Sequence, residues 1–333
     1  LEFIKAKEKN DALTNFNCSV AVSDAFMNAV EKDENYELIN PRNNRVSGTL
    51  KAREVFNLIV HMAWKNGEPG IVFIDRINEK NVLRKVGLIE STNPCGEQPL
   101  LPYESCNLGS INVARCVVNN GKSVSVDYEL LKDITYKAVH FLDNVIDVNN
   151  YPLPMIEEKT KANRKIGLGI MGFADMLIAL GIPYDSEAAL GVAKNVMSAI
   201  QDASKEASRA LAQERGAFPN FPLSDYAHNG DEPLRNATTT TIAPTGTISI
   251  IAGTSSGVEP IFALAYVRNV LDNNRLIESN PLFVEYCKEH GLFTDELMQK
   301  VAQTGSVAHI EELPEDVRGL FVTAHDIAPE WHV

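Results

Sequence analysis

The chain has 333 residues, of which 44% are hydrophobic and 23% are charged. This composition is typical of a globular protein with a large core, and it excludes a chain that is mainly disordered. The 31 Lys and Arg residues against 44 Asp and Glu residues give a net charge of −13. No nucleic-acid partner is expected, because so acidic a chain lacks the positive surface that neutralises phosphate backbones.

No apolar run reaches the roughly 18 to 20 residues that cross a bilayer, and the first residues lack the basic and apolar segments of a signal peptide. We therefore expect a cytoplasmic protein with no membrane partner. The sequence starts at Leu1 without an initiator Met and stops at Val333 without a helix stop signal. These ends predict that the chain is a piece of something longer.

The first half of the chain predicts short strands followed by one long helix. Runs of β-branched residues bounded by turn residues indicate strands at Asn15–Val20, Gly70–Asp75 and Ser123–Val126. Apolar residues spaced three and four apart indicate a helix over Tyr128–Val148. The residues that form one face of this helix are Leu131, Ile134, Ala138, Phe141, Leu142 and Val145.

The second half predicts two further helices. One spans about Ile166–Leu180, and the next begins after the N-cap candidate Asp185 and ends at Gly216. The first contains three closely spaced glycines, Gly167, Gly169 and Gly172. Their Gly-x-Gly-x-x-Gly order matches a dinucleotide-binding fingerprint, but no strand precedes it, so close helix packing is the favoured interpretation.

The run Ala237–Ile251 predicts a long strand interrupted at Pro244-Thr245-Gly246. The sequence shows no internal repeat and no low-complexity tract. Strands interleaved with three long amphipathic helices predict a layered or barrel-like α/β fold.

The segment from Ser91 to Ser110, named here the cysteine loop, predicts a long and stiff loop that presents a thiol. Its prolines and glycines exclude a regular helix. These residues are Pro94, Gly96, Pro99, Pro102 and Gly109. Cys95 stands between Asn93 and Glu97, and loops of such mixed composition commonly carry function.

Three interpretations of Cys95 are open from the residues alone. A thiolate nucleophile needs a base, but no His lies within twenty residues on either side, and Glu97 disfavours a thiolate by like-charge repulsion. A base from a distant part of the chain keeps this interpretation open. A neutral thiol suits hydrogen-atom chemistry better. The third interpretation is a proline-rich structural loop around a buried cysteine.

The other cysteines and the histidines predict no scaffold and no metal site. Five cysteines are an odd number, too few for a disulfide framework, and none forms a Cys-x-x-Cys pair. They are Cys18, Cys95, Cys106, Cys116 and Cys287. The seven histidines show no spacing typical of metal ligands.

The cysteine loop closely resembles the finger loop of the large catalytic subunit of ribonucleotide reductases, specifically of the adenosylcobalamin-dependent class II type. The resemblance lies in Asn-Pro-Cys-Gly-Glu-Gln-Pro-Leu at 93–100 and Pro-Tyr-Glu-Ser-Cys-Asn-Leu-Gly-Ser-Ile-Asn at 102–112. Class I subunits are less similar, since they generally have Leu at the position of Pro94. Further segments resemble the family in the same order: Leu1–Lys7, Asn15–Asn17, Gly169–Asp175 and Ala243–Ser249.

The resemblance implies that residues 1–333 form one catalytic region, much of a ten-stranded α/β barrel with the cysteine loop entering its centre. It implies reduction of ribonucleotides to deoxyribonucleotides with adenosylcobalamin as cofactor. Cys95 would become a thiyl radical that takes the 3′-hydrogen, Glu97 would accept the 3′-hydroxyl proton, and Asn93 would hold the ribose hydroxyls. Pro94 and Gly96, beside Cys95, would also contact the substrate.

The resemblance further implies that Cys106 is one member of a redox pair that ends as a disulfide. Its family partner, like the loop that reads the nucleotide effector, lies N-terminal to this chain. A thioredoxin-like or dithiol reductant would supply the electrons. Cys18 is not assigned as the partner, and Cys116 and Cys287 are interpreted as structural thiols.

A second site is predicted at Ala243–Ser249, named here the Thr-Gly-Thr loop. A Gly between Thr residues after a strand lets backbone N–H groups and hydroxyls converge on an anion, although no Lys follows as in a Walker loop. A plain turn between strands is the alternative. The resemblance implies that the loop binds the substrate's phosphates through Pro244, Thr245, Gly246, Thr247, Ile248 and Ser249.

Two alternative functions stay open. The chain could be a class I-type large subunit whose radical arrives from a partner protein. It could also be an inactive fragment or one half of a split protein, which works only with its N-terminal complement. A homodimer is a further expectation for the assembled protein.

Overall fold

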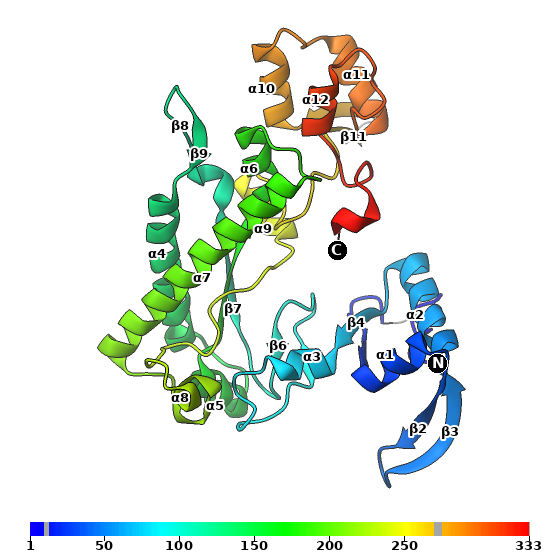
Figure 1. Cartoon of the computed structure of the whole chain (residues 1–333), viewed down its shortest axis with the longest axis vertical. Coiled ribbons are helices and arrows are strands. Elements are labelled where there is room, and N and C mark those ends of the chain that lie inside the picture. The colour runs from blue at the N-terminus through cyan, green and yellow to red at the C-terminus, as the bar shows by residue number, and fades with distance from the viewer. Residues whose placement is uncertain (10–12, 270–274, 333) are drawn as a thin grey trace. The chain divides into compact units, whose positions relative to one another are not determined.

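The computed structural model describes residues 1–9, 13–269 and 275–332. The chain forms two compact units, which are described separately (Figure 1). Unit 1 comprises Leu1–Ser105, Tyr151–Ala162 and Pro219–Glu232. Unit 2 comprises Cys106–Asn150, Asn163–Phe218 and Pro233–Val333.

Unit 1 consists of small two-stranded sheets with short helices. β1 pairs in parallel with β4, β2 forms an antiparallel hairpin with β3, and β5 pairs antiparallel with β6. α2 packs on α1 and ends at Gly67, whose φ of +85° is a left-handed conformation that glycine adopts readily. The elements are β1 (Ser19–Val22), α1 (Asp24–Glu31), β2 (Asn35–Asn40), β3 (Arg45–Lys51), α2 (Ala52–Asn66), β4 (Gly70–Phe73), α3 (Ile74–Glu79), β5 (Ser91–Thr92), β6 (Pro99–Leu100), α5 (Pro154–Asn163), a 3₁₀ turn (Phe221–Leu223) and α8 (Asp225–Asn229).

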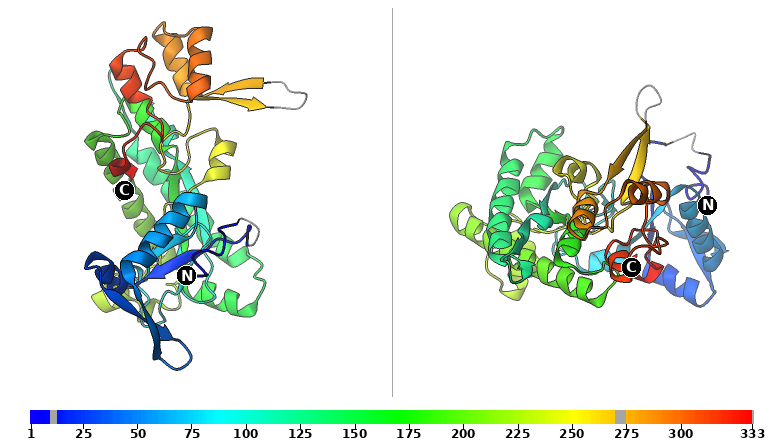
Figure 2. Two further views of the ribbon diagram at one scale, coloured as in Figure 1. Left: turned by 90° about the vertical axis from the view of Figure 1, so that its right-hand side faces the viewer. Right: turned by 90° about the horizontal axis from the view of Figure 1, so that it is seen from above.

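Unit 2 is built on the parallel strands β7 and β10, with α4 packed against both strands and against α7 (Figure 1). β11 and β12 form an antiparallel hairpin beside α11 (Figure 2). The elements are β7 (Asn107–Asn112), a 3₁₀ turn (Val113–Cys116), β8 (Val117–Asn119), β9 (Val124–Val126), α4 (Tyr128–Val148), β10 (Ile166–Met171), α6 (Phe173–Leu180), α7 (Glu187–Arg215), α9 (Gly246–Ala252), β11 (Ala265–Asn269), β12 (Arg275–Ser279), α10 (Pro281–Glu289), α11 (Asp295–Thr304), α12 (Glu315–Leu320) and a 3₁₀ turn (Pro329–His332).

The helix predicted over Tyr128–Val148 is confirmed with the same bounds. Asp127 caps it, since its carboxylate accepts a hydrogen bond from the Leu130 N–H at 2.9 Å. Its apolar face is buried against β7, β10 and α7, in a core that includes Leu131, Leu142, Ile146, Ile166, Ile170 and Ile200. The helix predicted to end at Gly216 is also confirmed as α7, but its N-cap is Ser186 and not Asp185.

The single helix predicted over Ile166–Leu180 is wrong in its first half. Ile166–Met171 is the strand β10, and only Phe173–Leu180 is helical. All six strand residues are buried, and a strand covered on both faces shows a continuous apolar run that periodicity cannot distinguish from a buried helix. The glycines therefore do not serve helix packing: Gly169 lies in the strand, and Gly172 turns the chain into α6 with φ +79°.

The long strand predicted over Ala237–Ile251 is wrong: its first half has only an isolated bridge to β10, and its second half is largely helical. Residues 237–241 run parallel to β10, with a bridge between Leu168 and Thr240. Gly246–Ala252 is instead the helix α9. Its β-branched residues suggested a strand, but the Ser249 N–H bonds to the Thr245 carbonyl and starts a helical turn.

The shorter predicted strands fare better. Gly70–Asp75 contains β4, and Ser123–Val126 contains β9. The strand predicted at Asn15–Val20 is shifted toward the C-terminus, where β1 covers Ser19–Val22. The shift follows from pairing, because Ser19 and Val22 lie opposite the two ends of β4.

Candidate active site

In unit 1 the cysteine loop narrows to a tip, residues 93–98, between the paired strands β5 and β6. Two hydrogen bonds between Asn93 and Gln98 close this tip. The Asn93 N–H donates to the Gln98 carbonyl at 3.1 Å, and the Gln98 N–H donates to Oδ1 of Asn93 at 2.9 Å. As predicted, no helix forms in the loop, and hydrogen bonds among its own residues close the tip.

Gly96 reverses the chain at this tip. Its φ of +90° is one that side chains disfavour, although a Cβ there would meet nothing within 4 Å. The preceding residue, Cys95, is exposed, while Asn93 and Glu97 are half-buried. This exposure contradicts the interpretation of Cys95 as a buried structural thiol. The tip presents the thiol to solvent with an amide and a carboxylate two residues away on either side.

The side chain of Asn93 has a structural role in the loop. Its carboxamide oxygen already accepts the Gln98 N–H. Its Nδ2 amino group is a hydrogen-bond donor in addition.

Cys106, the predicted redox cysteine, belongs to unit 2 and directly precedes β7. It is half-buried, and its Sγ lies 3.4 Å from the carbonyl oxygen of Asn107. The next residue, Asn107, donates from Nδ2 to the Leu142 carbonyl at 3.1 Å, which ties the start of β7 to α4. The thiol therefore sits at a fixed strand end.

The Thr-Gly-Thr loop of unit 2 contains both exposed and buried residues. Four of the six predicted substrate-binding residues are exposed: Pro244, Gly246, Thr247 and Ile248. The other two, Thr245 and Ser249, are buried and are held by other side chains and backbone. Thr245 has a left-handed backbone with φ 55°, and its Oγ1 accepts the Gly257 N–H at 2.7 Å.

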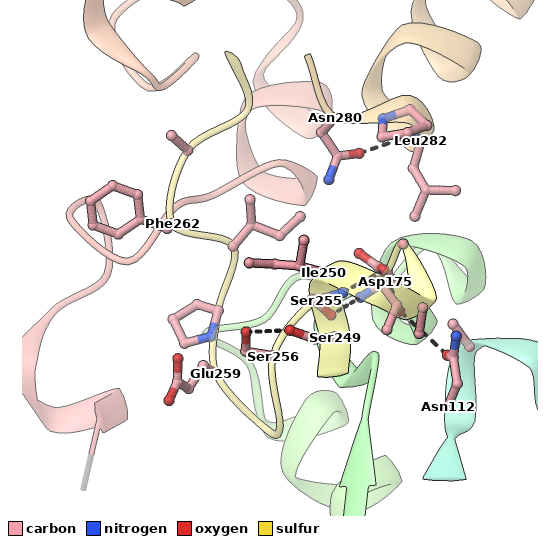
Figure 3. A pocket seen from close by; sticks show the side chains of 18 of the residues that line it. Asn112, Asp175, Ser249, Ile250, Ser255, Ser256, Glu259, Phe262, Asn280 and Leu282 are labelled. Carbon is pink, nitrogen blue, oxygen red and sulfur yellow. Dashed lines mark hydrogen bonds between the residues drawn. The ribbon is translucent and has the colours of Figure 1, made fainter. Parts of the chain in front are cut away.

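A cavity of about 770 Å³ lies beside α9, within unit 2 (Figure 3). Its lining joins the ends of β7 and α9 with the start of α10, and includes Asn112, Asp175, Ser249, Ile250, Phe262 and Asn280. Ile250 and Phe262 are 80% and 73% exposed. The cavity thus has an apolar rim and a floor of hydrogen-bonded polar groups.

Asp175 is the residue of this region that sequence reasoning did not single out as functional. It is 8% exposed, and its carboxylate accepts hydrogen bonds from Thr254 and Ser255. The available sequence signal was an Asp within an apolar run, just after the three glycines. A carboxylate buried in such a run requires hydrogen-bond partners. The partners lie about 80 residues away in sequence, so no pattern reveals them.

The remaining thiols have environments unlike that of Cys95. Burial raises the pKa of Cys287 to about 11, and burial, together with the charge of Asp127, raises the pKa of Cys116. Both raised pKa values support the interpretation of these cysteines as structural thiols.

Across the described ranges, no group of three or more His, Cys, Asp or Glu side chains is placed to hold a metal ion. Among the helices of the described residues, none has the length and apolar character that a membrane span requires.

Comparisons with known proteins agree with the resemblance of the cysteine loop. The family model described as "Ribonucleotide reductase, barrel domain" matches residues 1–232 and 227–333. A vitamin B12-dependent ribonucleoside-diphosphate reductase of Thermoplasma acidophilum is 52% identical over 100% of this chain and 43% of its own length. A protein of the same name from Mycobacterium tuberculosis H37Rv is 49% identical over 100% of this chain and 46% of its own length.

The solved structure of an Actinobacillus ureae class Id ribonucleotide reductase alpha subunit has the same fold. It superimposes with a TM-score of 0.70 at 23% identity, over 92% of this chain and 54% of its own. The chain thus spans about half the length of the relatives that it matches. The predicted α/β barrel fold of the reductase type is confirmed, and the chain belongs to the ribonucleotide reductase family, whose barrel domain it contains.

Proposed function

We propose that this chain carries the radical cysteine of an adenosylcobalamin-dependent ribonucleotide reductase, and that the intact protein reduces ribonucleotides to 2′-deoxyribonucleotides. The observation that carries the proposal is the exposed thiol of Cys95 on a hydrogen-bonded loop tip, in a chain about 50% identical to reductases named vitamin B12-dependent. A cytoplasmic location belongs to the same proposal.

The chemistry assigned to the tip follows from its three polar side chains. Cys95, oxidised to a thiyl, takes the 3′-hydrogen atom of the ribose. Glu97 accepts the proton of the 3′-hydroxyl as a general base, and the Nδ2 group of Asn93 donates to a ribose hydroxyl. A tip closed by its own hydrogen bonds favours this chemistry, because reacting atoms must be held in place before the radical forms.

The chain's residues fit the cofactor in one respect. Adenosylcobalamin, when bound, supplies the organic radical that oxidises a thiol. Cys95 is exposed together with its neighbours Pro94 and Gly96, so the thiol is accessible to such a radical. Cobalamin brings its cobalt inside the corrin ring, so the chain needs no ligand cluster of its own for the metal.

The Thr-Gly-Thr loop is proposed to bind the phosphates of the substrate. Its exposed Gly246 and Thr247 offer backbone N–H groups and a hydroxyl to an anion, and no carboxylate stands within Ala243–Ser249. Backbone donors allow a protein with a net charge of −13 to hold an anionic substrate without a basic surface.

Cys106 is proposed to supply electrons as one member of a redox pair. Each turnover removes a hydroxyl group and leaves a disulfide, so a thioredoxin-like or dithiol reductant must restore the pair. The proposal assigns the partner cysteine and the nucleotide effector site to an N-terminal complement or a second subunit.

The alternative of a class I-type subunit, driven by a radical from a partner protein, has weaker support. Pro94 stands where class I subunits generally have Leu, and the relatives that are about half identical are named vitamin B12-dependent. The two functions differ in one measurable step, which is oxidation of the thiol by the bound cofactor.

The test is exchange of tritium between solvent and the 5′ carbon of adenosylcobalamin, with the intact protein, a dithiol and a nucleotide effector. We expect exchange in the wild type and none in Cys95→Ala, because the Cys95 thiol carries the exchanging hydrogen. Cys106→Ala is the matched control: it should retain exchange and lose repeated turnover with the dithiol. Exchange that persists in Cys95→Ala, or that is absent from the wild type, would contradict the proposal.

A further inference from the structure

The Thr-Gly-Thr loop begins with an unusual backbone conformation. Thr245 has φ 55° and ψ 24°, a left-handed conformation that β-branched residues rarely adopt because the side chain crowds the backbone. Thr245 is only 7% exposed. A buried residue in this conformation must be held there by its surroundings.

A single residue from a neighbouring turn holds Thr245. The N–H of Gly257 donates to Oγ1 of Thr245 at 2.7 Å. Gly257 itself has φ +44°, and a Cβ at this position would lie 2.8 Å from the carbonyl oxygen of Ala243. The turn of residues 254–257, named here the brace turn, therefore lies against Ala243 at the start of the loop and against Thr245, the N-cap residue of α9.

Asp175 anchors the brace turn to the start of α6. Its Oδ2 accepts hydrogen bonds from Oγ1 of Thr254 at 2.7 Å and from the N–H of Ser255 at 2.8 Å (Figure 3). In return the Asp175 N–H donates to Oγ of Ser255 at 3.2 Å, and the Gly172 N–H donates to the Ser255 carbonyl at 2.7 Å. Four hydrogen bonds thus fix two residues of the brace turn to the corner between β10 and α6.

The middle of α9 is hydrogen-bonded to the same turn. Oγ of Ser249 and Oγ of Ser256 lie 2.9 Å apart, and the Thr254 N–H donates to the Ser249 carbonyl at 3.0 Å. The brace turn therefore contacts the loop at two points, Thr245 and Ser249. These are the two predicted substrate-binding residues that are buried.

We infer that Asp175 is a positioning residue for phosphate binding: through the brace turn it holds Thr245 in its left-handed conformation, so that Gly246 and Thr247 stay aimed outward. This inference rests on the proposed role of the Thr-Gly-Thr loop. A loop ordered before the ligand arrives binds more tightly, because binding no longer has to order it. Loss of the anchor should therefore weaken the binding of phosphate-bearing ligands and leave binding of the nucleoside part unchanged.

The test compares CDP with cytidine, its phosphate-free counterpart, by calorimetry on the intact protein. In Asp175→Ala we expect the affinity for CDP to fall about tenfold, with that for cytidine unchanged. In Asp175→Asn the amide oxygen can accept both hydrogen bonds, so both affinities should stay within about twofold. Asp202→Ala, an exposed position on α7, is the control for removing a carboxylate.

A second pair of variants tests the inference independently, in case Asp175→Ala does not fold. Thr254→Val keeps the shape and removes one of the two hydrogen bonds to the carboxylate, so we expect about threefold weaker binding of CDP. Thr254→Ser keeps the hydroxyl and should match the wild type. In turnover the weakened variants should show a raised KM for the ribonucleotide with kcat nearly unchanged, which a general loss of folded protein would not produce.

The outcomes separate this inference from the function on which it rests. A wild type that prefers CDP to cytidine, with the same preference in Asp175→Ala and Thr254→Val, would overturn the inference alone. A wild type that binds CDP no better than cytidine would overturn the phosphate-binding role of the loop, and the positioning role with it.

Discussion

At the scale of single residues, the thiols of this chain are distinguished by burial. Cys95 is exposed on a turn that only Gly96 can make without strain, whereas Cys116 and Cys287 are buried completely. A buried thiol ionises reluctantly, because its charged form loses the solvation of water. Solvent exposure therefore separates Cys95, the proposed radical cysteine, from the buried Cys116 and Cys287.

This difference predicts selective alkylation of the folded protein. With iodoacetamide at pH 8, Cys95 should be labelled first and Cys287 at least about 100-fold more slowly, because a pKa of about 11 leaves roughly one thiol in a thousand as thiolate. The thiolate fraction of Cys287 rises tenfold per pH unit below its pKa, so its labelling should accelerate from pH 8 to pH 9. Peptide mapping by mass spectrometry measures both rates. Equal rates in the folded protein, without urea, would contradict the assignment.

The sequence alone identified candidate site residues that lie close together along the chain. Asn93, Cys95 and Glu97 lie within five positions, and the loop around them contains prolines and glycines that exclude other structures. It did not reach Asp175, Thr254 or Gly257 as parts of one brace, because their contacts cross 12 to 80 positions and leave no periodic signal. These residues come into contact only when the chain has folded and β10 and α9 have formed.

At the scale of elements, the strand β10 and the helix α9 show why local patterns failed. β10 is buried on both faces, and residues 237–241 cover one of its edges. Gly169 allows this approach, since a Cβ there would lie 2.5 Å from the Thr241 carbonyl oxygen. Gly169 is thus explained by a close backbone contact with Thr241. The residues around Gly169 give no sign of this contact, because Thr241 is distant in sequence.

Substitution of Gly169 tests this contact. Gly169→Ala should destabilise the protein by about 3 kcal/mol, because the backbone of Thr241 cannot move aside as a flexible side chain could. Gly191→Ala is the matched control: Gly191 lies in α7, its Cβ would meet nothing within 4 Å, and the change should stabilise by about 0.5 to 1 kcal/mol. Urea unfolding measures both changes. Opposite signs support the strand contact, and a neutral Gly169→Ala would contradict it.

At the scale of the whole molecule, the proposed chemistry is distributed over both units. Cys95 belongs to unit 1, and Cys106 and the Thr-Gly-Thr loop belong to unit 2. Each unit must therefore be stable enough to hold its own candidate residues in place. The sequence alone predicted the order of these parts along the chain, while the division into units depends on contacts between distant segments.

Unit 2 is held together by a buried cluster of charged side chains. Asp143 on α4 is fully buried, and it bonds to Arg164 at 2.9 Å, to Arg235 at 3.3 Å and to Nδ2 of Asn236 at 3.0 Å. Burial lowers the pKa of Arg164, but Asp147 and Asp143 more than offset this effect and raise it above its usual value. The guanidinium therefore stays charged, and the cluster joins α4 to the segments before β10 and before the Thr-Gly-Thr loop.

Removal of the central carboxylate should destabilise unit 2 far more than removal of a surface carboxylate on the same helix. Asp143→Ala removes a fully buried carboxylate from both Arg164 and Arg235; Arg164 keeps its pair with Asp147, but breaking a buried ion pair in this way costs about 3 to 5 kcal/mol. Asp133→Ala is the matched control, because it has the same change in helix propensity and breaks only an exposed pair with Lys137, worth about 0.5 kcal/mol or less. Urea unfolding of the two variants gives the comparison. If Asp143→Ala costs no more than Asp133→Ala, the cluster does not hold the unit together, and packing of α4 against α7 and β10 must do so alone.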